Sequence, residues 1–195
     1  ATIERGRDLQ QSSASLSVRS GDLHRYFVES LVDHLPPEAA RFLVLVSFVD
    51  NLSPALCEAI TLQPDCAATL SRLRELTPIF SESVDGDWSR IHPLAREFLV
   101  SRFAQLPEAE RREYRGRAAR WLEAHGQYEE AARQMLEAGL VDTAYGLVAR
   151  VLHDVLIRGQ VSVVADWIER LPQAEILGRT SLRLTVGWIL AQSDR

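Results

Sequence analysis

The stretch WSRIHPLAREFL, residues 88–99, places a histidine where a polar, turn-rich segment meets an amphipathic helix. Pro93 opens that helix, so His92 lies at its N-terminus, where backbone N–H groups favour anions. An imidazole N–H beside a helix N-terminus suits a phosphate oxygen. The simpler interpretation is that His92 only caps the junction, and the residues alone favour it. Arg90 and Arg96 are weaker candidates for phosphate or carboxylate contacts, with an ordinary surface role as the alternative.

Other chemistry is excluded by what the sequence lacks. It contains no lysine, so the phosphate-binding loop G-x-x-x-x-G-K-[ST] and lysine Schiff-base chemistry are both ruled out. The G-x-S-x-G, H-E-x-x-H and C-x-x-C motifs are missing as well. The five histidines are scattered, and no two have the i, i+4 spacing of a helical metal site. We therefore expect neither catalysis nor a bound metal or cofactor in this chain.

Composition points to an ordinary globular protein. The hydrophobic fraction is 46% and the charged fraction 25%, and no apolar run is long enough to cross a bilayer. A net charge of −5 gives no general attraction to nucleic acid or anionic lipid. The N-terminal segment lacks the apolar core of a secretion signal. With two cysteines, interpreted as reduced thiols, the expected location is the cytoplasm.

Helix signals dominate the first half of the chain. Asp22, Pro37, Ser53 with Pro54, and Asp65 each mark a helix start, and Leu70, Leu73 and Leu76 are expected to point inward from the last of these helices. Asp85-Gly86 then predicts the turn of a β-hairpin, before the helix opened by Pro93, which carries Leu94, Phe98, Leu99 and Phe103 on one side. Three short helices followed by a hairpin is the order of a winged helix.

DNA binding by this winged helix is not favoured. The recognition helix offers Arg72 and Arg74, but Glu75 lies beside them. The wing is acidic, with Glu82, Asp85 and Asp87, although a wing that faces phosphates should be basic. The sequence therefore favours a winged helix that acts as a mechanical joint between neighbouring domains and does not bind DNA itself.

From Pro107 onward the chain is expected to be all-helical. Apolar stripes recur in antiparallel pairs of about 35–45 residues, which is typical of a tetratricopeptide-like solenoid. Such solenoids bind effectors or partner proteins on a concave face. Tyr128, Tyr145 and Trp167 are the candidate effector- or partner-binding residues, and a purely structural role is the alternative.

Three segments resemble the MalT-like LuxR-family transcriptional regulators, which belong to the STAND class of signalling ATPases. They are RYFVESLVDHLPPEAARFLVLVSFVDNLSPALCEAI, RIHPLAREFLVSRF and RAARWLEAHGQYEEAARQMLEAG. In the first segment the matching positions are Leu31, Leu35, Pro36, Phe42, Leu43, Ser47, Asp50, Leu52, Ser53, Leu56 and Cys57. The chain departs from the family pattern at Ile91, where an aromatic is usual, and at Pro93.

The resemblance implies a middle fragment of a larger regulator, in which the winged helix joins an upstream ATPase domain to the sensor domain. It further implies that His92 approaches the β-phosphate of bound ADP, and that DNA is bound only through a C-terminal helix-turn-helix outside this chain. The expected domains are a tail or ATPase remnant (1–21), a winged helix (22–105) and a truncated helical-repeat domain (106–195). The expected partners are the upstream ATPase domain and an inducer or regulatory protein at the repeats. The alternative is a stand-alone helical adaptor.

Overall fold

The computed structural model describes residues 29–82, 88–159 and 161–193. The expected tail, the Asp22 cap and the Asp85-Gly86 turn lie outside these residues. The chain divides into two compact units, residues 1–114 (unit 1) and 115–195 (unit 2). The boundary expected from the sequence, 105/106, precedes this division by part of a helix. Among the described helices, none combines the length and apolar character that a membrane crossing requires.

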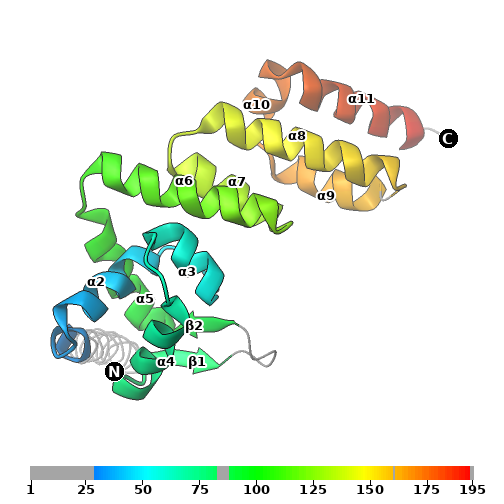
Figure 1. Cartoon of the computed structure of the whole chain (residues 1–195). Helices are drawn as coiled ribbons and strands as arrows, with labels where there is room; N and C mark the ends of the chain where they lie inside the picture. The colour runs from blue at the N-terminus through cyan, green and yellow to red at the C-terminus, as the bar shows by residue number, and fades with distance from the viewer. Residues whose placement is uncertain (1–28, 83–87, 160, 194–195) are drawn as a thin grey trace, which may run out of the picture. The chain divides into compact units, whose positions relative to one another are not determined.

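Unit 1 contains short helices and one hairpin (Figure 1). The helices are α2 (Pro37–Val46), α3 (Pro54–Thr61), α4 (Cys66–Leu76) and α5 (Pro93–Ala104), and the strands are β1 (Phe80–Glu82) and β2 (Ser89–Ile91). The strands pair antiparallel, with Phe80 opposite Ile91. An isolated antiparallel bridge joins Leu52 to Ser89, so the segment between α2 and α3 lies along the other edge of β2. This arrangement is a winged helix.

Some of the helix caps and buried positions predicted for unit 1 agree with the structure, and others do not. Ser53 caps α3, because its Oγ accepts a hydrogen bond from the Leu56 N–H at 3.2 Å. Asp65 occupies the N-cap position of α4 in a left-handed conformation (φ 61°), and its side chain makes no capping bond. Leu76 was expected to point inward, but it is 49% exposed at the end of α4. Leu94 is also partly exposed, and Ala95 takes the buried position in the first turn of α5.

The core of unit 1 forms where the helices meet. Its fully buried large side chains are Phe42, Leu43, Leu52, Leu56, Ile60, Leu70, Leu73, Leu99 and Phe103. The rings of Phe48 and Phe103 lie 4.7 Å apart between centroids, which joins the end of α2 to the end of α5. The position of α5 is thus fixed at its far end by aromatic packing.

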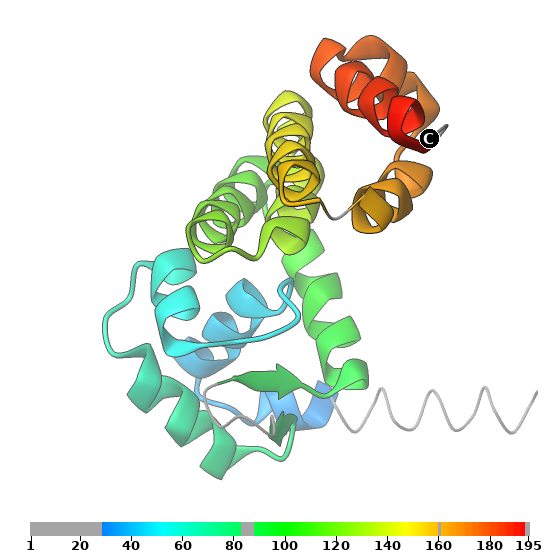
Figure 2. The same cartoon turned by 90° about the vertical axis from the view of Figure 1, so that its right-hand side faces the viewer.

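Unit 2 is helical throughout its described residues. The helix α6 (Glu108–Ala124) continues from unit 1 into unit 2, and it is followed by α7 (Tyr128–Glu137), α8 (Val141–Ile157), α9 (Val161–Arg170), α10 (Gln173–Gly178) and α11 (Thr180–Ser193). Gly126 and Gly139 end α6 and α7 with φ of 74°, as expected for glycine C-caps. In Figure 2, α8 and α11 are seen roughly end-on.

In unit 2, α7 packs on α8, α8 on α9 and α10 on α11, and α11 also packs on both α8 and α9. Many buried positions are alanines, including Ala118, Ala131 and Ala144, so the helices approach closely. The predicted fold class, mainly α with a winged helix and one hairpin, is confirmed. The tetratricopeptide-like solenoid stays a prediction.

Cys57 and Cys66 are free thiols, both completely buried, on either side of the α3–α4 turn. Burial raises the pKa of both thiols, and for Cys57 the nearby Cys66 and Glu58 raise it further. The native state therefore favours the neutral thiols.

We expect this pKa shift to appear as a loss of stability in alkali. Because the native pKa lies above the unfolded value of about 8.5, the thiols' contribution is present below that pH and is lost as the pH rises. The free energy of unfolding, measured in urea between about pH 8 and 9.5, should fall with pH. In the double variant Cys57→Ala/Cys66→Ala the fall should be smaller, and an unchanged slope would contradict the assignment.

Candidate functional site

The junction between β2 and α5 holds the sequence candidates of unit 1. Leu52 and Ser89 exchange two backbone hydrogen bonds of 2.8 Å, and the His92 N–H donates to the Ile79 carbonyl at 2.7 Å. Pro93 then begins α5, so the backbone of His92 is fixed at the N-cap with φ −51° and ψ 135°. The imidazole is exposed and makes no capping hydrogen bond. His92 therefore occupies the N-cap position through its backbone, and its imidazole makes no capping hydrogen bond.

Arg90 lies two residues before His92, and the buried Ile91 separates them. Because side chains alternate along a strand, Arg90 and His92 face the same, exposed side. The Arg90 Nε donates to the Asn51 Oδ1 at 2.6 Å. Arg90 lines a groove with Asp50, Arg96 and Glu97, and His92 is not among the lining residues. The His92 imidazole and the first-turn N–H groups of α5 are therefore the donors that favour an anion at this junction.

Arg96 has a different environment from the other two candidates. Its Nε donates to the Ser47 carbonyl at 3.1 Å, and one terminal nitrogen lies 3.2 Å from the Phe48 carbonyl and 2.7 Å from the Asp50 carboxylate. Ser47 is the C-cap of α2. The guanidinium thus satisfies carbonyl groups at the end of α2 and joins that helix to α5, which is a structural role.

The exposed face of α4 offers little to DNA. Arg72 is exposed beside Glu75, and Arg74 donates to the Ser89 hydroxyl within unit 1. The wing residues 83–87 lie outside the described part of the chain.

In unit 2, the aromatic candidates line two adjoining pockets. Tyr145 and Trp167 line a pocket of about 310 Å³ formed by α7, α8 and the end of α9. Trp167 and Tyr128 line a second pocket, also of about 310 Å³. Tyr145 is buried, burial raises the pKa of its hydroxyl, and the Arg179 guanidinium lies 4.8 Å from its ring centroid. Trp167 is therefore shared, whereas Tyr128 and Tyr145 belong to different pockets.

Arg179 holds this region together by charge. It pairs with Asp142 at 2.8 Å and with Glu175 at 3.1 Å, so it joins the start of α8 to α10. Asp142 is 94% exposed, so its pair with Arg179 is weakened by solvent.

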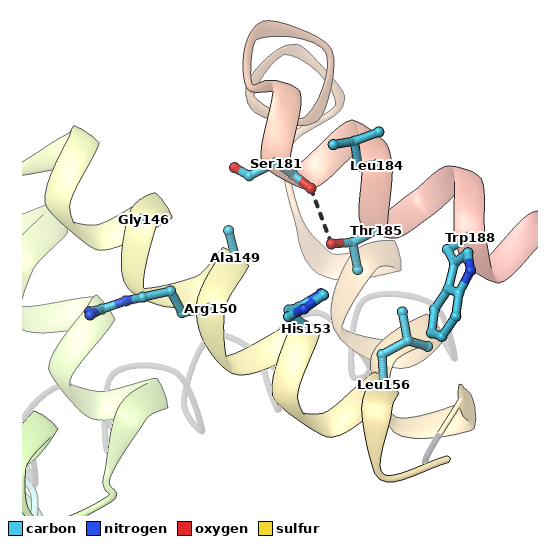
Figure 3. Close-up of a pocket in the computed structure, with 9 residues that line it drawn as sticks. All are labelled: Gly146, Ala149, Arg150, His153, Leu156, Ser181, Leu184, Thr185 and Trp188. Atoms are coloured by element: carbon cyan, nitrogen blue, oxygen red, sulfur yellow. Dashed lines mark hydrogen bonds between the residues drawn. The ribbon is translucent and has the colours of Figure 1, made fainter.

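A larger pocket, of about 520 Å³, lies between α8 and α11 (Figure 3). Its lining is mostly apolar and includes Gly146, His153, Leu184 and Trp188. Sequence reasoning did not assign this pocket. The available signals were a glycine inside a helix and two large apolar residues one turn apart on α11.

Comparison with known proteins supports the fold assignment. Residues 28–112 match the model of the MalT winged helix domain family. The chain is 27% identical over 196 residues to the HTH-type transcriptional regulator MalT of Vibrio parahaemolyticus, covering 96% of this chain and 21% of that protein. It is 25% identical over 180 residues to the HTH-type transcriptional regulator AlkS of Pseudomonas putida, covering 89% and 20%.

A third relative has a different name. The serine/threonine-protein kinase PknK of Mycobacterium tuberculosis is 25% identical over 189 residues, covering 96% of this chain and 17% of that protein. The chain thus spans about a fifth of the length of the curated relatives it matches.

Fold and junction together define unit 1 as a winged helix protein module. More narrowly, it is a winged helix domain of the MalT type, and over nearly its whole length the chain is similar to MalT-like regulators of the LuxR family. The resemblance noted in the sequence is confirmed.

We expect the loss of the Arg96 guanidinium to destabilise unit 1 without a ligand. Arg96→Met keeps the apolar stem but leaves two carbonyls and Asp50 without this partner. For a half-buried group this should lower the free energy of unfolding by about 1–2 kcal/mol. The control is Arg72→Met on the exposed face of α4. Its free energy of unfolding should stay within about 0.5 kcal/mol of wild type. Equal urea midpoints for the two variants would remove the structural role.

Proposed function

We propose that this chain is a non-catalytic relay within a larger, cytoplasmic transcriptional regulator. The winged helix senses the nucleotide bound to an ATPase domain of the same protein, and the helical half receives an effector or a partner protein. Transcription is controlled through DNA bound by another part of the protein. ATP and ADP are ligands of that ATPase domain.

The observation that carries this proposal is the free imidazole of His92. Its backbone is held by Ile79 and by the start of α5, while its ring faces outward without a capping bond. A phosphate oxygen approaching the N-terminus of α5 would meet the imidazole and backbone N–H groups together. Release of that contact when ADP leaves would free the winged helix from the ATPase domain.

The relatives support a relay rather than an output role. Two are named as HTH-type transcriptional regulators and one as a serine/threonine-protein kinase, yet each is similar to almost the whole of this chain. A region found with different named activities is best explained as the part that transmits a signal.

For the receiving role of the helical half, we propose the faces that carry Tyr128, Tyr145 and Trp167. Trp167 and Tyr128 are partly exposed, and charged side chains such as Arg133 and Arg170 border the Tyr145 pocket. An aromatic surface with a charged border suits a protein partner.

The nucleotide role predicts that His92→Ala weakens ADP binding in the full-length protein. A hydrogen bond to a charged group contributes about 1.5–3 kcal/mol, so the dissociation constant for ADP should rise about tenfold or more. It can be measured by equilibrium dialysis with radiolabelled ADP. Arg90→Gln should have a smaller effect in the same direction.

The matched control is His34→Ala, which also removes an exposed imidazole from unit 1. The His34 ring bonds to the Ser30 carbonyl, and the adjacent Asp33 pairs with Arg102 in the last turn of α5, at the opposite end from His92. ADP affinity should be unchanged in this variant. If His92→Ala retains ADP as wild type does, His92 is not the sensor.

A further inference from the structure

We propose that the pocket between α8 and α11 binds a small uncharged amphiphile, a molecule with an apolar or aromatic body and one hydrogen-bonding group. Binding of this ligand does not depend on the proposed function. Only its role as a regulatory effector rests on that function.

The pocket is built from one face of each helix. Its walls are Gly146, Ala149, His153 and Leu156 on α8, and Ser181, Leu184, Thr185 and Trp188 on α11. These positions recur at the spacing of a single helix face. With about 520 Å³, the pocket lies within the range of small-molecule sites, about 300–1,000 Å³. Two apolar walls facing each other can enclose a flat or chain-like body.

Most polar groups around the pocket already have partners. Arg150 pairs with Glu123 at 2.7 Å, and its side chain points away from α11 in Figure 3. The Thr185 hydroxyl donates to the Ser181 carbonyl at 3.1 Å, which leaves its methyl group for the pocket. His153 lies between the two helices, and within the described part of the chain its ring has no hydrogen bond or ion pair. One hydrogen-bonding group on the ligand is therefore matched by His153.

The charge of the pocket selects a neutral ligand. None of its described lining residues is acidic, and Arg150 is paired with Glu123. A carboxylate held against these apolar walls would lose part of its hydration, and the guanidinium of Arg150 is already paired with Glu123, so its binding is less favourable. A hydroxyl or carbonyl group meets no such penalty when it bonds to His153.

Gly146 and the exposed apolar residues give the site its shape. Glycine weakens a helix relative to alanine, and a Cβ added at Gly146 would meet nothing within 4 Å. No close packing inside unit 2 requires this glycine, but its missing side chain enlarges the pocket. Trp188 is 49% exposed and Leu184 is 69% exposed, so the opposite wall offers apolar surface that a ligand would cover.

The test uses 4-ethylphenol as the probe, with 4-ethylbenzoate as its anionic counterpart. Isothermal titration calorimetry on the whole chain at pH 7.5 should give a dissociation constant of about 1 mM or below for 4-ethylphenol. The benzoate should bind at least about tenfold more weakly. His153→Phe should weaken 4-ethylphenol binding severalfold.

The decisive pair of variants is Gly146→Leu and Gly187→Leu. Both replace a glycine inside a helix whose added Cβ would meet nothing within 4 Å, so both should keep or raise the melting temperature. Only Gly146 lines the pocket. Gly146→Leu should therefore reduce affinity at least about tenfold by filling the pocket, whereas Gly187→Leu should bind as wild type.

Equal affinity of the two leucine variants for 4-ethylphenol would overturn the proposal. Equal affinity of the wild type for 4-ethylphenol and 4-ethylbenzoate would overturn it as well. Absence of 4-ethylphenol binding up to its solubility limit would also overturn it and would leave this face to a protein helix. His92→Ala should bind the probe as wild type does, so the outcome is separate from that of the nucleotide role.

Discussion

The pairing of Leu52 with Ser89 is the constraint on which the winged helix junction depends. Ser89 is buried, and both of its backbone polar groups bond to Leu52, while its hydroxyl accepts a bond from Arg74. Ser89 thus joins the segment between α2 and α3, the helix α4 and the hairpin. Because α5 begins only four residues later, the direction of β2 decides where the N-terminus of α5 and the His92 ring lie. A buried backbone pair of this kind is costly to break, so the junction is stiff.

Because the junction is stiff, the position of His92 is set by its backbone, and its imidazole is not needed to hold the fold. The backbone of His92 is held by Ile79, and α5 is held against α2 by Arg96 and by the contact of Phe48 with Phe103. None of these interactions uses the imidazole. A side chain that is placed by its backbone, but makes no bond of its own there, can respond to an external group without weakening the fold. The three neighbouring candidates, Arg90, His92 and Arg96, therefore have different environments in the structure.

The sequence predicted the elements better than the side-chain roles. Ser53 with Pro54 is a local signal, since a cap depends only on the next few residues, and it was correct. Asp65 marks the start of α4 as predicted, but its backbone is left-handed and its side chain makes no capping bond. Leu76 continues an apolar stripe, but it is the last residue of α4 and is 49% exposed, which periodicity does not reveal. Arg96 could not be assigned, because its carbonyl partners lie almost fifty residues earlier in the chain.

The pocket of unit 2 was hidden from the sequence for a related reason. Hydrophobic periodicity detects large side chains, whereas this pocket is defined by the small ones, Gly146 and Ala149, opposite Leu184 and Trp188. The two units consequently present opposite chemistry. The junction of unit 1 exposes the His92 imidazole at the N-terminus of α5, where an anion is favoured, and the pocket of unit 2 has mostly apolar walls with Arg150 paired to Glu123. A nucleotide phosphate and a neutral amphiphile would not compete for the same site, so a protein built this way can respond to both at once.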